Sequence, residues 1–240
     1  MTTTADIRLR ARAGQVTGRD HILRGMNCQD AYTLLEQADA VIGIVCDGCG
    51  VGGRSEVGAA LAAQFISGRV ARALAEGIAL EGLPDVIYAE TIRFLEGIVS
   101  AVDPMNRPGF VRDYLLFTVI GVVITPTGGV IFAAGDGLIV LDSRMIRRDE
   151  NNTPSYIGYH VVDPAVLAEA ALPSGFDIYP LPSDWARVAI ATDGFEADVL
   201  PNLWGKAHPR GVQRWLNVLS SQEKRFRDDA TVIAVERIGA

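Results

Sequence analysis

Residues 41–53, VIGIVCDGCGVGG, constrain the possible folds of this chain more than any other stretch. The apolar, mostly β-branched residues up to position 45 are typical of a buried strand. The strand runs into Asp47, and four of the six residues that follow are glycine. Glycine lets the backbone approach a ligand closely and also tolerates the positive φ of a tight turn. Because a carboxylate at such a place is unfavourable without a cation or hydrogen-bond donors, the sequence predicts a partner for Asp47.

Composition and charge narrow the class of protein. The chain has 240 residues, of which 49% are hydrophobic, enough for a sizeable core and too many for a disordered chain. The formal net charge of -7 disfavours a nucleic-acid-binding surface, or a patch for anionic membranes, that is built on positive charge. We therefore expect neither nucleic acid nor membrane among the partners.

Signals for export and membrane insertion are missing from the sequence. No segment approaches the roughly 20 continuous apolar residues of a membrane span. The first six residues, MTTTAD, lack the basic and apolar regions of a signal peptide, so we expect a cytoplasmic location. Three cysteines, at positions 28, 46 and 49, are an odd number and do not suggest a disulfide framework.

The first half of the chain reads as three strands and then two helices. Apolar and basic residues alternate over residues 7–13, which predicts a half-exposed strand. Residues 18–30 are expected to form a loop. Residues 31–35 are expected to form a second strand, before the strand at 41–47. Short connections favour antiparallel pairing among these three strands. The two helices that follow predict a helical layer packed on a sheet.

Both helices have an apolar face. The first is expected over residues 54–76, with Ser55 as its N-cap. Its face is expected to contain Val57, Leu61, Phe65, Ile66, Val70 and Leu74. The second begins at Pro84 and ends before Pro104.

The second half returns mainly to strands. Residues 115–125 and 130–134 form a hairpin around the turn at 126–129, and further strands are expected at 138–141, 187–192 and 231–235. A helix is expected at 209–220. Residues 144–183 read as a partly irregular insertion, with a short helix near 164–171, and such segments often serve as lids or binding loops. Since no repeat or linker is evident, we expect a single domain over residues 1–240.

Aspartates recur beside the expected strands. Asp47, Asp136 and Asp193 are each followed by glycine, whereas Asp30 and the pair at 228–229 come just before strands. Each Asp-Gly alone is also a common turn. Strand ends of an antiparallel sheet can share one rim, where clustered carboxylates would repel one another and raise their pKa values. Divalent cations relieve this repulsion, and oxygen ligands suit Mg²⁺ or Mn²⁺.

Five motifs in series carry a resemblance to a known family. They are CQDA at 28–31, VCDGCG at 45–50, AGDG at 134–137, ATDG at 191–194 and DDATV at 228–232. Their order and wording resemble the metal-dependent protein phosphatase 2C family, in a divergent bacterial-type form. The resemblance implies an α+β fold, a four-layer αββα sandwich of two antiparallel sheets flanked by helices.

The resemblance also implies a centre of two divalent cations, Mn²⁺ or Mg²⁺. The implied metal ligands are Asp47, the Gly48 carbonyl, Asp193, Asp228 and, at the position before the first aspartate, Gln29. Asp30 would act on the reaction mainly through bound water. The remaining residues implied beside the centre are Asp136, which also acts through water, and Asp229. His21 is a separate candidate that could help proton transfer near the site; a structural or an exposed histidine is the alternative.

The implied activity is that of a protein-serine/threonine phosphatase. A metal-bridging water would attack the phosphate monoester directly, without a phosphoenzyme. The substrate would be a phosphorylated protein in a signalling system that could include a cognate kinase; the oligomeric state is left open.

Two departures from the family pattern keep a second interpretation open. Gln29 stands where the family usually has a glutamate, and Gly25 stands where an arginine commonly binds the substrate phosphate. Arg24, next to that position, and Arg19 are the candidates to replace it. The alternative function is a catalytically weak or inactive phosphatase-fold module with a regulatory or binding role.

A zinc or redox site is a further alternative. Cys46-x-x-Cys49, Cys28 and one of His21, His160 or His208 would make a Cys₃His set. This hypothesis leaves the Asp-Gly motifs unexplained, and a cysteine at a buried strand end is commonly a small core residue.

Overall fold

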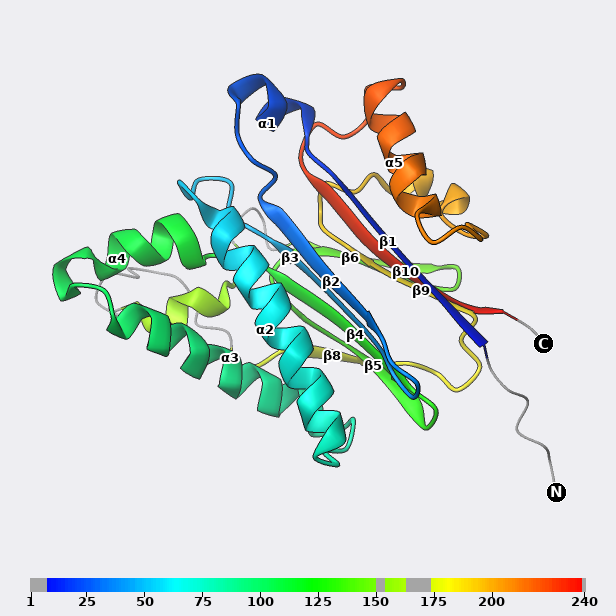
Figure 1. Cartoon of the computed structure of the whole chain (residues 1–240), viewed down its shortest axis with the longest axis horizontal. Coiled ribbons are helices and arrows are strands. Elements are labelled where there is room, and N and C mark those ends of the chain that lie inside the picture. Colours follow the sequence, from blue (N-terminus) through cyan, green and yellow to red (C-terminus); the bar gives the residue numbers. More distant parts are fainter. Residues whose placement is uncertain (1–7, 150–153, 163–173, 239–240) are drawn as a thin grey trace.

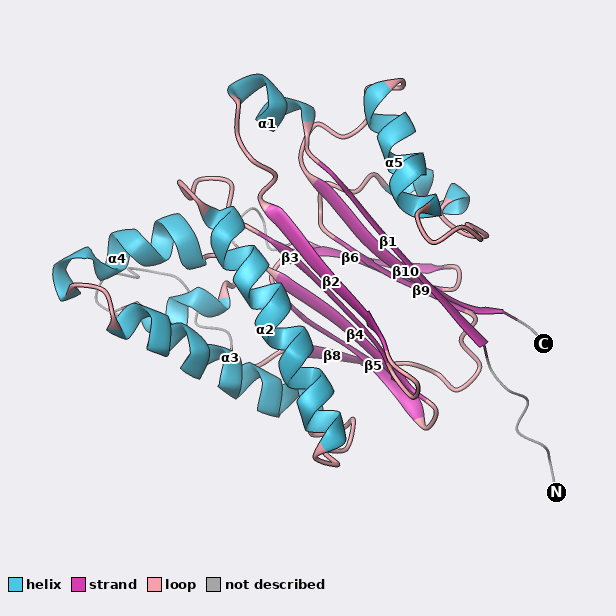
Figure 2. Cartoon of the chain, in the orientation of Figure 1, coloured by secondary structure: helices cyan, strands magenta, loops and turns pink. Residues whose placement is uncertain are grey.

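Two five-stranded antiparallel sheets pack face to face, with helices on both outer surfaces (Figures 1 and 2). This computed structural model describes residues 8–149, 154–162 and 174–238. In spatial order the first sheet contains β2 (Asp30–Glu36), β3 (Val41–Asp47), β4 (Val119–Thr125), β5 (Gly128–Ala134) and β8 (Asp177–Pro180). The second contains β1 (Arg8–Val16), β10 (Ala230–Ile238), β9 (Arg187–Ala191), β6 (Gly137–Leu141) and β7 (Arg144–Arg148). The predicted αββα sandwich is confirmed.

Three buried clusters hold the layers together. One lies between the sheets and includes Val45, Ile120 and Ile233. A second packs the first sheet against α2 (Ser55–Ala75) and α3 (Leu83–Ser100). A third packs the second sheet against α5 (Gly211–Ser221) and the 3-10 segment η5 (Ala197–Asn202). Every sheet face is therefore covered, and folding buries apolar side chains on both sides of the central strands.

Strand β3 shows why the opening sequence is apolar without interruption. Successive side chains of a strand point to opposite faces of the sheet. Val41 and Val45 belong to the cluster between the sheets, whereas Ile42 and Ile44 belong to the cluster under the helices. Because both faces are buried, neither tolerates polar residues until the strand ends at Asp47.

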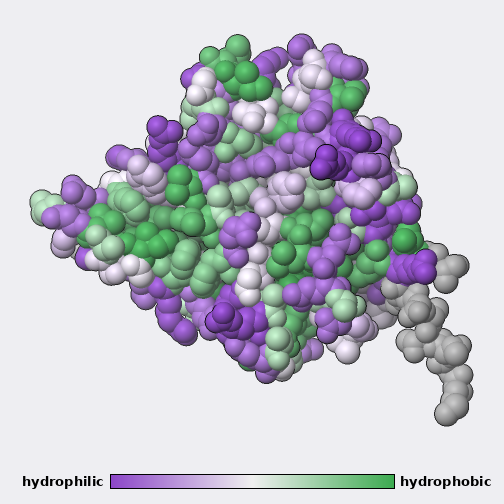
Figure 3. Space-filling model, viewed as in Figure 1, coloured by the Kyte–Doolittle hydropathy of each residue, from purple (hydrophilic) through white to green (hydrophobic). Residues whose placement is uncertain are grey.

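The pairing of β1 differs from the sequence prediction. Three consecutive strands with short connections were expected to pair with one another, but only β2 and β3 do so among them. β1 instead pairs with β10 in the other sheet, from Arg8 with Ile238 to Val16 with Ala230. The loop predicted at 18–30 contains the short helix α1 (Arg19–Arg24), which joins the two sheets. Its exposed Ile22 and Leu23 break any amphipathic pattern and account for the apolar tip over α1 in Figure 3.

Helix α2 buries only part of the predicted face: Ile66 and Val70 are buried, and Phe65 and Leu74 are partly buried against the same core. Val57 and Leu61 are 42% and 44% exposed, and Arg54 rather than Ser55 is the N-cap residue. The buried side is made of small residues with Ile66 and Val70, including Gly58, Ala59, Ala62, Ala63 and Ala73. Small side chains let the helix axis lie close to the sheet, and hydrophobic size alone did not reveal this face.

Other segments refine the expected boundaries. Residues 107–115 form α4 (Arg107–Phe110) and the π-helical η2 (Val111–Leu115), after the short η1 (Pro104–Asn106), so β4 begins at Val119 rather than at 115. Residues 135–136 carry the chain from β5 in the first sheet to β6 in the second.

The segment at 144–183 contributes β7, β8 and η3 (Ile157–Val161), and the helix expected at 164–171 lies outside the described residues. None of the helices in the described ranges is long and apolar enough to cross a membrane.

Two glycines of α2 provide a test of its close packing. A Cβ at Gly58 would clash with the carbonyl oxygen of Tyr114 in η2, whereas a Cβ at the exposed Gly68 would meet nothing within 4 Å. We expect Gly58→Ala to lower the free energy of unfolding by about 1–3 kcal/mol through overpacking. Gly68→Ala should raise it by about 0.5–1 kcal/mol through helix propensity. Urea unfolding of both variants measures the difference, and equal stabilities would contradict the close contact between α2 and η2.

Candidate metal centre

The aspartates of the five motifs meet at one end of the sandwich. β2 begins with Asp30 where β3 ends with Asp47, and the two residues are register partners. In the other sheet the pairing of Ala191 with Val232 brings the end of β9 to the beginning of β10, and so brings Asp193 towards Asp228. Asp136 lies between β5 and β6, where the chain passes from one sheet to the other. Antiparallel pairing therefore gathers these carboxylates from distant parts of the sequence.

A cavity of about 380 Å³ opens at this end. Its lining is Gln29, Asp47, Gly48, Cys49, Gly50, Val51, Leu116, Thr118, Asp136, Pro154, Tyr156, Tyr159, Asp193 and Asp228. A larger groove of about 580 Å³ runs between the edge strands β1 and β2, but its lining includes a single acidic residue, Glu36. The smaller cavity is thus where the carboxylates are concentrated.

The backbone around Asp47 is held tightly. The Thr118 amide donates to the Asp47 carbonyl oxygen at 2.8 Å, and the Gly48 amide donates to the Gln29 carbonyl oxygen at 3.2 Å. A Cβ at Gly48 would lie 2.8 Å from that carbonyl oxygen and 2.8 Å from Ser55 Oγ, so only glycine fits. The glycines after Asp47 all have φ outside the positive range, so close approach rather than a left-handed turn explains Gly48.

The carboxylates strongly perturb one another. Burial and then the charges of Asp30 and Asp193 raise the pKa of Asp47 well above its usual range. Burial raises the pKa of Asp30 to about 7, helped by the charges of Asp229 and Asp193 and opposed by a hydrogen bond from Thr192 Oγ1 at 2.8 Å. These groups cannot all ionise at neutral pH unless positive charge comes between them.

Two buried oxygen atoms support a fit to cations. Asp30 Oδ1 and Gln29 Oε1 have no hydrogen-bond partner within the described part of the chain. Gln29 Nε2 donates to Ser55 Oγ at 2.8 Å, which leaves the amide oxygen as the unpaired atom. Unpaired oxygens beside crowded carboxylates form a hard, all-oxygen donor set, and this set fits Mg²⁺ or Mn²⁺.

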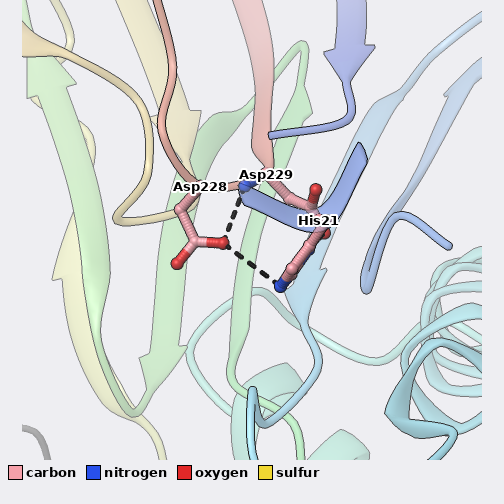
Figure 4. A group of neighbouring side chains, drawn as sticks. All are labelled: His21, Asp228 and Asp229. Atoms are coloured by element: carbon pink, nitrogen blue, oxygen red, sulfur yellow. Dashed lines mark hydrogen bonds and ion pairs between the residues drawn. The ribbon is translucent and has the colours of Figure 1, made fainter. Parts of the chain in front are cut away.

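Asp229 organises the loop that leads into the centre. Its Oδ1 accepts from the Gly18 amide at 2.7 Å, and its Oδ2 accepts from the Gln29 amide at 2.5 Å. His21 Nδ1 lies 2.8 Å from the same Oδ2. Figure 4 shows the three side chains together, with dashed lines that join Asp228 to His21 and to the Asp229 amide. The buried Asp229 carboxylate therefore fixes both ends and the helix of the segment 18–29.

The two arginine candidates lie apart from the cavity lining. Arg19 and Arg24 are exposed on α1, and Arg24 Nε donates to the Asp20 carbonyl oxygen at 3.0 Å. Neither side chain lines the cavity in the described part of the structure. Arg19 and Arg24 are therefore predicted site residues that lie outside this cavity. The predicted residues that line it are Gln29, Asp47, Gly48, Asp136, Asp193 and Asp228.

The cysteines give no support to a zinc or redox site. All three are free, and Cys46 lies in the core under the helices. Burial raises the pKa of the Cys28 and Cys46 thiols, which disfavours the thiolate that zinc binding needs. The cluster of possible ligand side chains found within the described ranges contains His21, Asp228 and Asp229, and no cysteine.

Several residues of the site were not predicted from the sequence. Tyr156 and Tyr159 form a cavity wall next to η3, and Thr192 joins the rims of the two sheets through its bond to Asp30. Thr118 lines the cavity just before β4. Thr192 lies inside the ATDG motif and could have been noticed there, whereas the tyrosines lie in a stretch without periodicity.

These features define a class of αββα proteins with a carboxylate-lined cavity at one end of the sandwich. A sequence model described as "Protein phosphatase 2C" matches residues 17–230. The chain belongs to the protein phosphatase 2C family. A comparison with curated proteins found no match.

Solved structures share the fold at low sequence identity. A bacterial serine phosphatase aligns with a TM-score of 0.66 and 13% identity, covering 97% of this chain and 99% of the other. The serine/threonine phosphatase Stp1 from Staphylococcus aureus aligns with a TM-score of 0.64 and 14% identity, covering 100% and 99%. RsbX, solved in complex with magnesium, aligns with a TM-score of 0.56 and 13% identity, covering 96% of each chain. At these identities the likeness establishes the fold alone.

The raised pKa values predict an unusual pH dependence of stability without metal. A carboxyl group whose pKa rises on folding stabilises the fold below its unfolded pKa, and the contribution is lost as the pH rises through the folded pKa. For Asp30 the loss runs from its ordinary pKa of 3.8 up to its folded pKa of about 7, above which it is complete. The metal-free protein should therefore gain stability from Asp30 and Asp47 as the pH falls from 8 towards 5, as thermal unfolding in chelator would show.

The substitution Asp47→Asn isolates the contribution of one carboxylate. At pH 8 in chelator it should raise the free energy of unfolding, because it removes a buried carboxylate that its neighbours repel. Added Mn²⁺ should stabilise the wild type more than the variant. Asp39→Asn, in an exposed turn, is the matched control and should change neither result. A less stable metal-free Asp47→Asn would contradict the proposed repulsion.

Proposed function

We propose that the chain is a metal-dependent phosphoprotein phosphatase that hydrolyses phosphoserine and phosphothreonine monoesters by direct attack of water. The observation that carries this proposal is the crowding of Asp47 with Asp30 and Asp193, which raises the pKa of Asp47 at a cavity of about 380 Å³. Proteins rarely retain such an unfavourable arrangement unless it serves a function. Family membership supports the reaction class.

We propose two divalent cations, Mn²⁺ or Mg²⁺, as the cofactors. Asp47, the Gly48 carbonyl, Asp193, Asp228 and the Gln29 amide oxygen would hold them. When bound, such cations neutralise phosphate charge and make a water more acidic. The magnesium complex of RsbX, a protein of the same fold, supports this assignment.

The chain's own residues have separate tasks in this proposal. Asp30, held by Thr192, and Asp136, buried at the sheet crossing, orient water in the cavity. Asp229 and His21 hold the segment 18–29 in place. Tyr156 and Tyr159 line the cavity and would contact the phosphorylated side chain of the substrate.

The wider setting belongs to the proposal as well. The substrate would be a phosphorylated protein in a signalling system, with a cognate kinase as its counterpart. We propose one phosphatase domain over residues 1–240, in which the segment 144–183 acts as a flap beside the cavity. Its Pro154, Tyr156 and Tyr159 line that cavity, which supports the flap role. A cytoplasmic location agrees with this setting.

A Mn²⁺-dependent assay with an aryl phosphate tests the activity. The wild type should hydrolyse it between pH 6 and 9. Asp47→Asn should lower kcat by about a hundredfold or more, because the variant loses a ligand of the cations that would neutralise the charge of the phosphate. Asp39→Asn is the matched control and should keep wild-type rates. Circular dichroism confirms that each variant is folded.

A regulatory module is the second candidate function. Gln29 favours it, because its amide is already bound to Ser55 and is a weaker ligand than the carboxylate usual in the family. Absence of turnover by the wild type with Mn²⁺ and with Mg²⁺, on both aryl phosphate and phosphopeptides, would establish this alternative. Gln29→Glu should then restore turnover if the missing charge is the cause.

Arg24 and Arg19 are the proposed contacts of the substrate phosphate. Both are exposed, so they would reach the substrate at the entrance of the cavity. Arg24→Ala should raise KM for a phosphopeptide about tenfold, equivalent to about 1.4 kcal/mol, with little change in kcat. Arg19→Ala tests the second candidate, and Arg8→Ala on β1 is the control. An unchanged KM in the Arg19→Ala, Arg24→Ala double variant would remove both from the site.

A further inference from the structure

His21 is buried although it lies on an exposed helix. Its exposed fraction is 5%, whereas its neighbours Ile22 and Leu23 are 60% and 77% exposed. α1 thus turns one polar ring inwards, towards the start of β10 (Figure 4). This burial needs a reason beyond packing, since a buried polar ring must be satisfied at both nitrogen atoms.

The hydrogen bonds of Asp229 fix the orientation of the ring. Asp229 accepts from two backbone amides, of Gly18 and Gln29, so its oxygen atoms act as acceptors. His21 Nδ1, 2.8 Å from Asp229 Oδ2, therefore faces an acceptor. This contact directs the other nitrogen, Nε2, towards Asp228. A carboxylate that orients a histidine in this way is the usual support of a metal-binding imidazole.

Nε2 faces a second carboxylate without bonding to it. Its distance to Asp228 Oδ1 is 3.8 Å, longer than a hydrogen bond, and no hydrogen bond to Nε2 is formed within the described ranges. The possible ligand atoms of His21, Asp228 and Asp229 all lie within 4.8 Å of one another, close enough to share one cation. Asp228 is 67% exposed at its side chain, so water can complete the surroundings of whatever binds there.

We propose that His21 Nε2 and the Asp228 carboxylate bind a divalent transition-metal ion at the edge of the carboxylate cavity. Asp229 would remain the orienting partner, because its oxygens already accept three N–H groups. An imidazole ligand suits Mn²⁺, Fe²⁺, Co²⁺ or Zn²⁺ and discriminates against Mg²⁺, which prefers oxygen. The inference adds a nitrogen ligand to the all-oxygen centre and concerns metal binding, so it holds whether or not the chain hydrolyses phosphate.

The other two histidines lack this arrangement. His160 Nε2 lies 2.8 Å from the Tyr88 hydroxyl, and His208 Nδ1 accepts from the Arg210 amide at 3.0 Å. Neither belongs to a cluster of possible ligand side chains within the described ranges. His208, which is exposed, is therefore a suitable control position.

His21→Asn separates the ligand role from the structural role. The asparagine amide can still donate to Asp229 from near the position of Nδ1, but nothing replaces Nε2. Pulsed electron paramagnetic resonance of the protein with Mn²⁺ should show coupling to ¹⁴N in the wild type and in His208→Asn, and none in His21→Asn. Calorimetric titration should show at least tenfold weaker binding of Mn²⁺ by His21→Asn, with Mg²⁺ binding unchanged.

Two further samples make the test decisive. His21→Gln places an oxygen near Nε2 and loses the donor to Asp229, so it should lose the ¹⁴N coupling and also destabilise the fold. Asp47→Asn, which removes the proposed catalytic centre, should keep the ¹⁴N coupling. Absence of ¹⁴N coupling in the wild type, or equal Mn²⁺ affinities of the wild type and a folded His21→Asn, would overturn the proposal and indicate an imidazolium paired with Asp228.

Discussion

The functional end of the molecule depends on one buried carboxylate, Asp229. It stands at the start of β10 and accepts hydrogen bonds from the amides of Gly18 and Gln29 and from His21. Those bonds join the second sheet to the segment that leads into the first. Without them, Gln29 would have no fixed place, and its carbonyl oxygen could not receive the Gly48 amide beside Asp47. A charge buried with this many donors is stable, and replacing it would leave several amides unsatisfied.

The rest of the centre opposes stability. The pairing of β2 with β3 holds Asp30 and Asp47 close together, and both carboxyl groups have raised pKa values. The close-packed apolar core keeps the two strands in place, so the repulsion between the carboxylates persists. The core between the sheets, which includes Val45, Ile120 and Ile233, supplies the free energy that offsets this repulsion. The candidate site residues thus lie at the ends of the strands, whereas the residues that stabilise the fold lie in the middle of the strands.

The architecture and the carboxylates were predicted for different reasons. The resemblance of five motifs to a known family implied the αββα sandwich. The buried strand at 41–47 and the Asp-Gly motifs at strand ends were predicted from local patterns of residues. The partner of β1 was not predictable, since its pairing with β10 joins residues at opposite ends of the chain. The buried face of α2 was predicted only in part: Ile66 and Val70 were expected there, but close packing also selects Gly58 and alanines, and leaves Val57 and Leu61 exposed. The tyrosine wall depends on how an irregular segment lies over the cavity, and no periodicity encodes it.

The β1–β10 ladder has a consequence for biosynthesis. During translation β1 leaves the ribosome long before β10 has been made. This strand, which contains three arginines, therefore has no pairing partner until about 200 further residues have been synthesised. Those positive charges discourage association of its unpaired edge with other chains in the meantime. Closure of the second sheet is a late, long-range step, which favours slow folding. Because Asp228 and Asp229 arrive with β10, the nascent chain cannot assemble the proposed metal centre before β10 has been made.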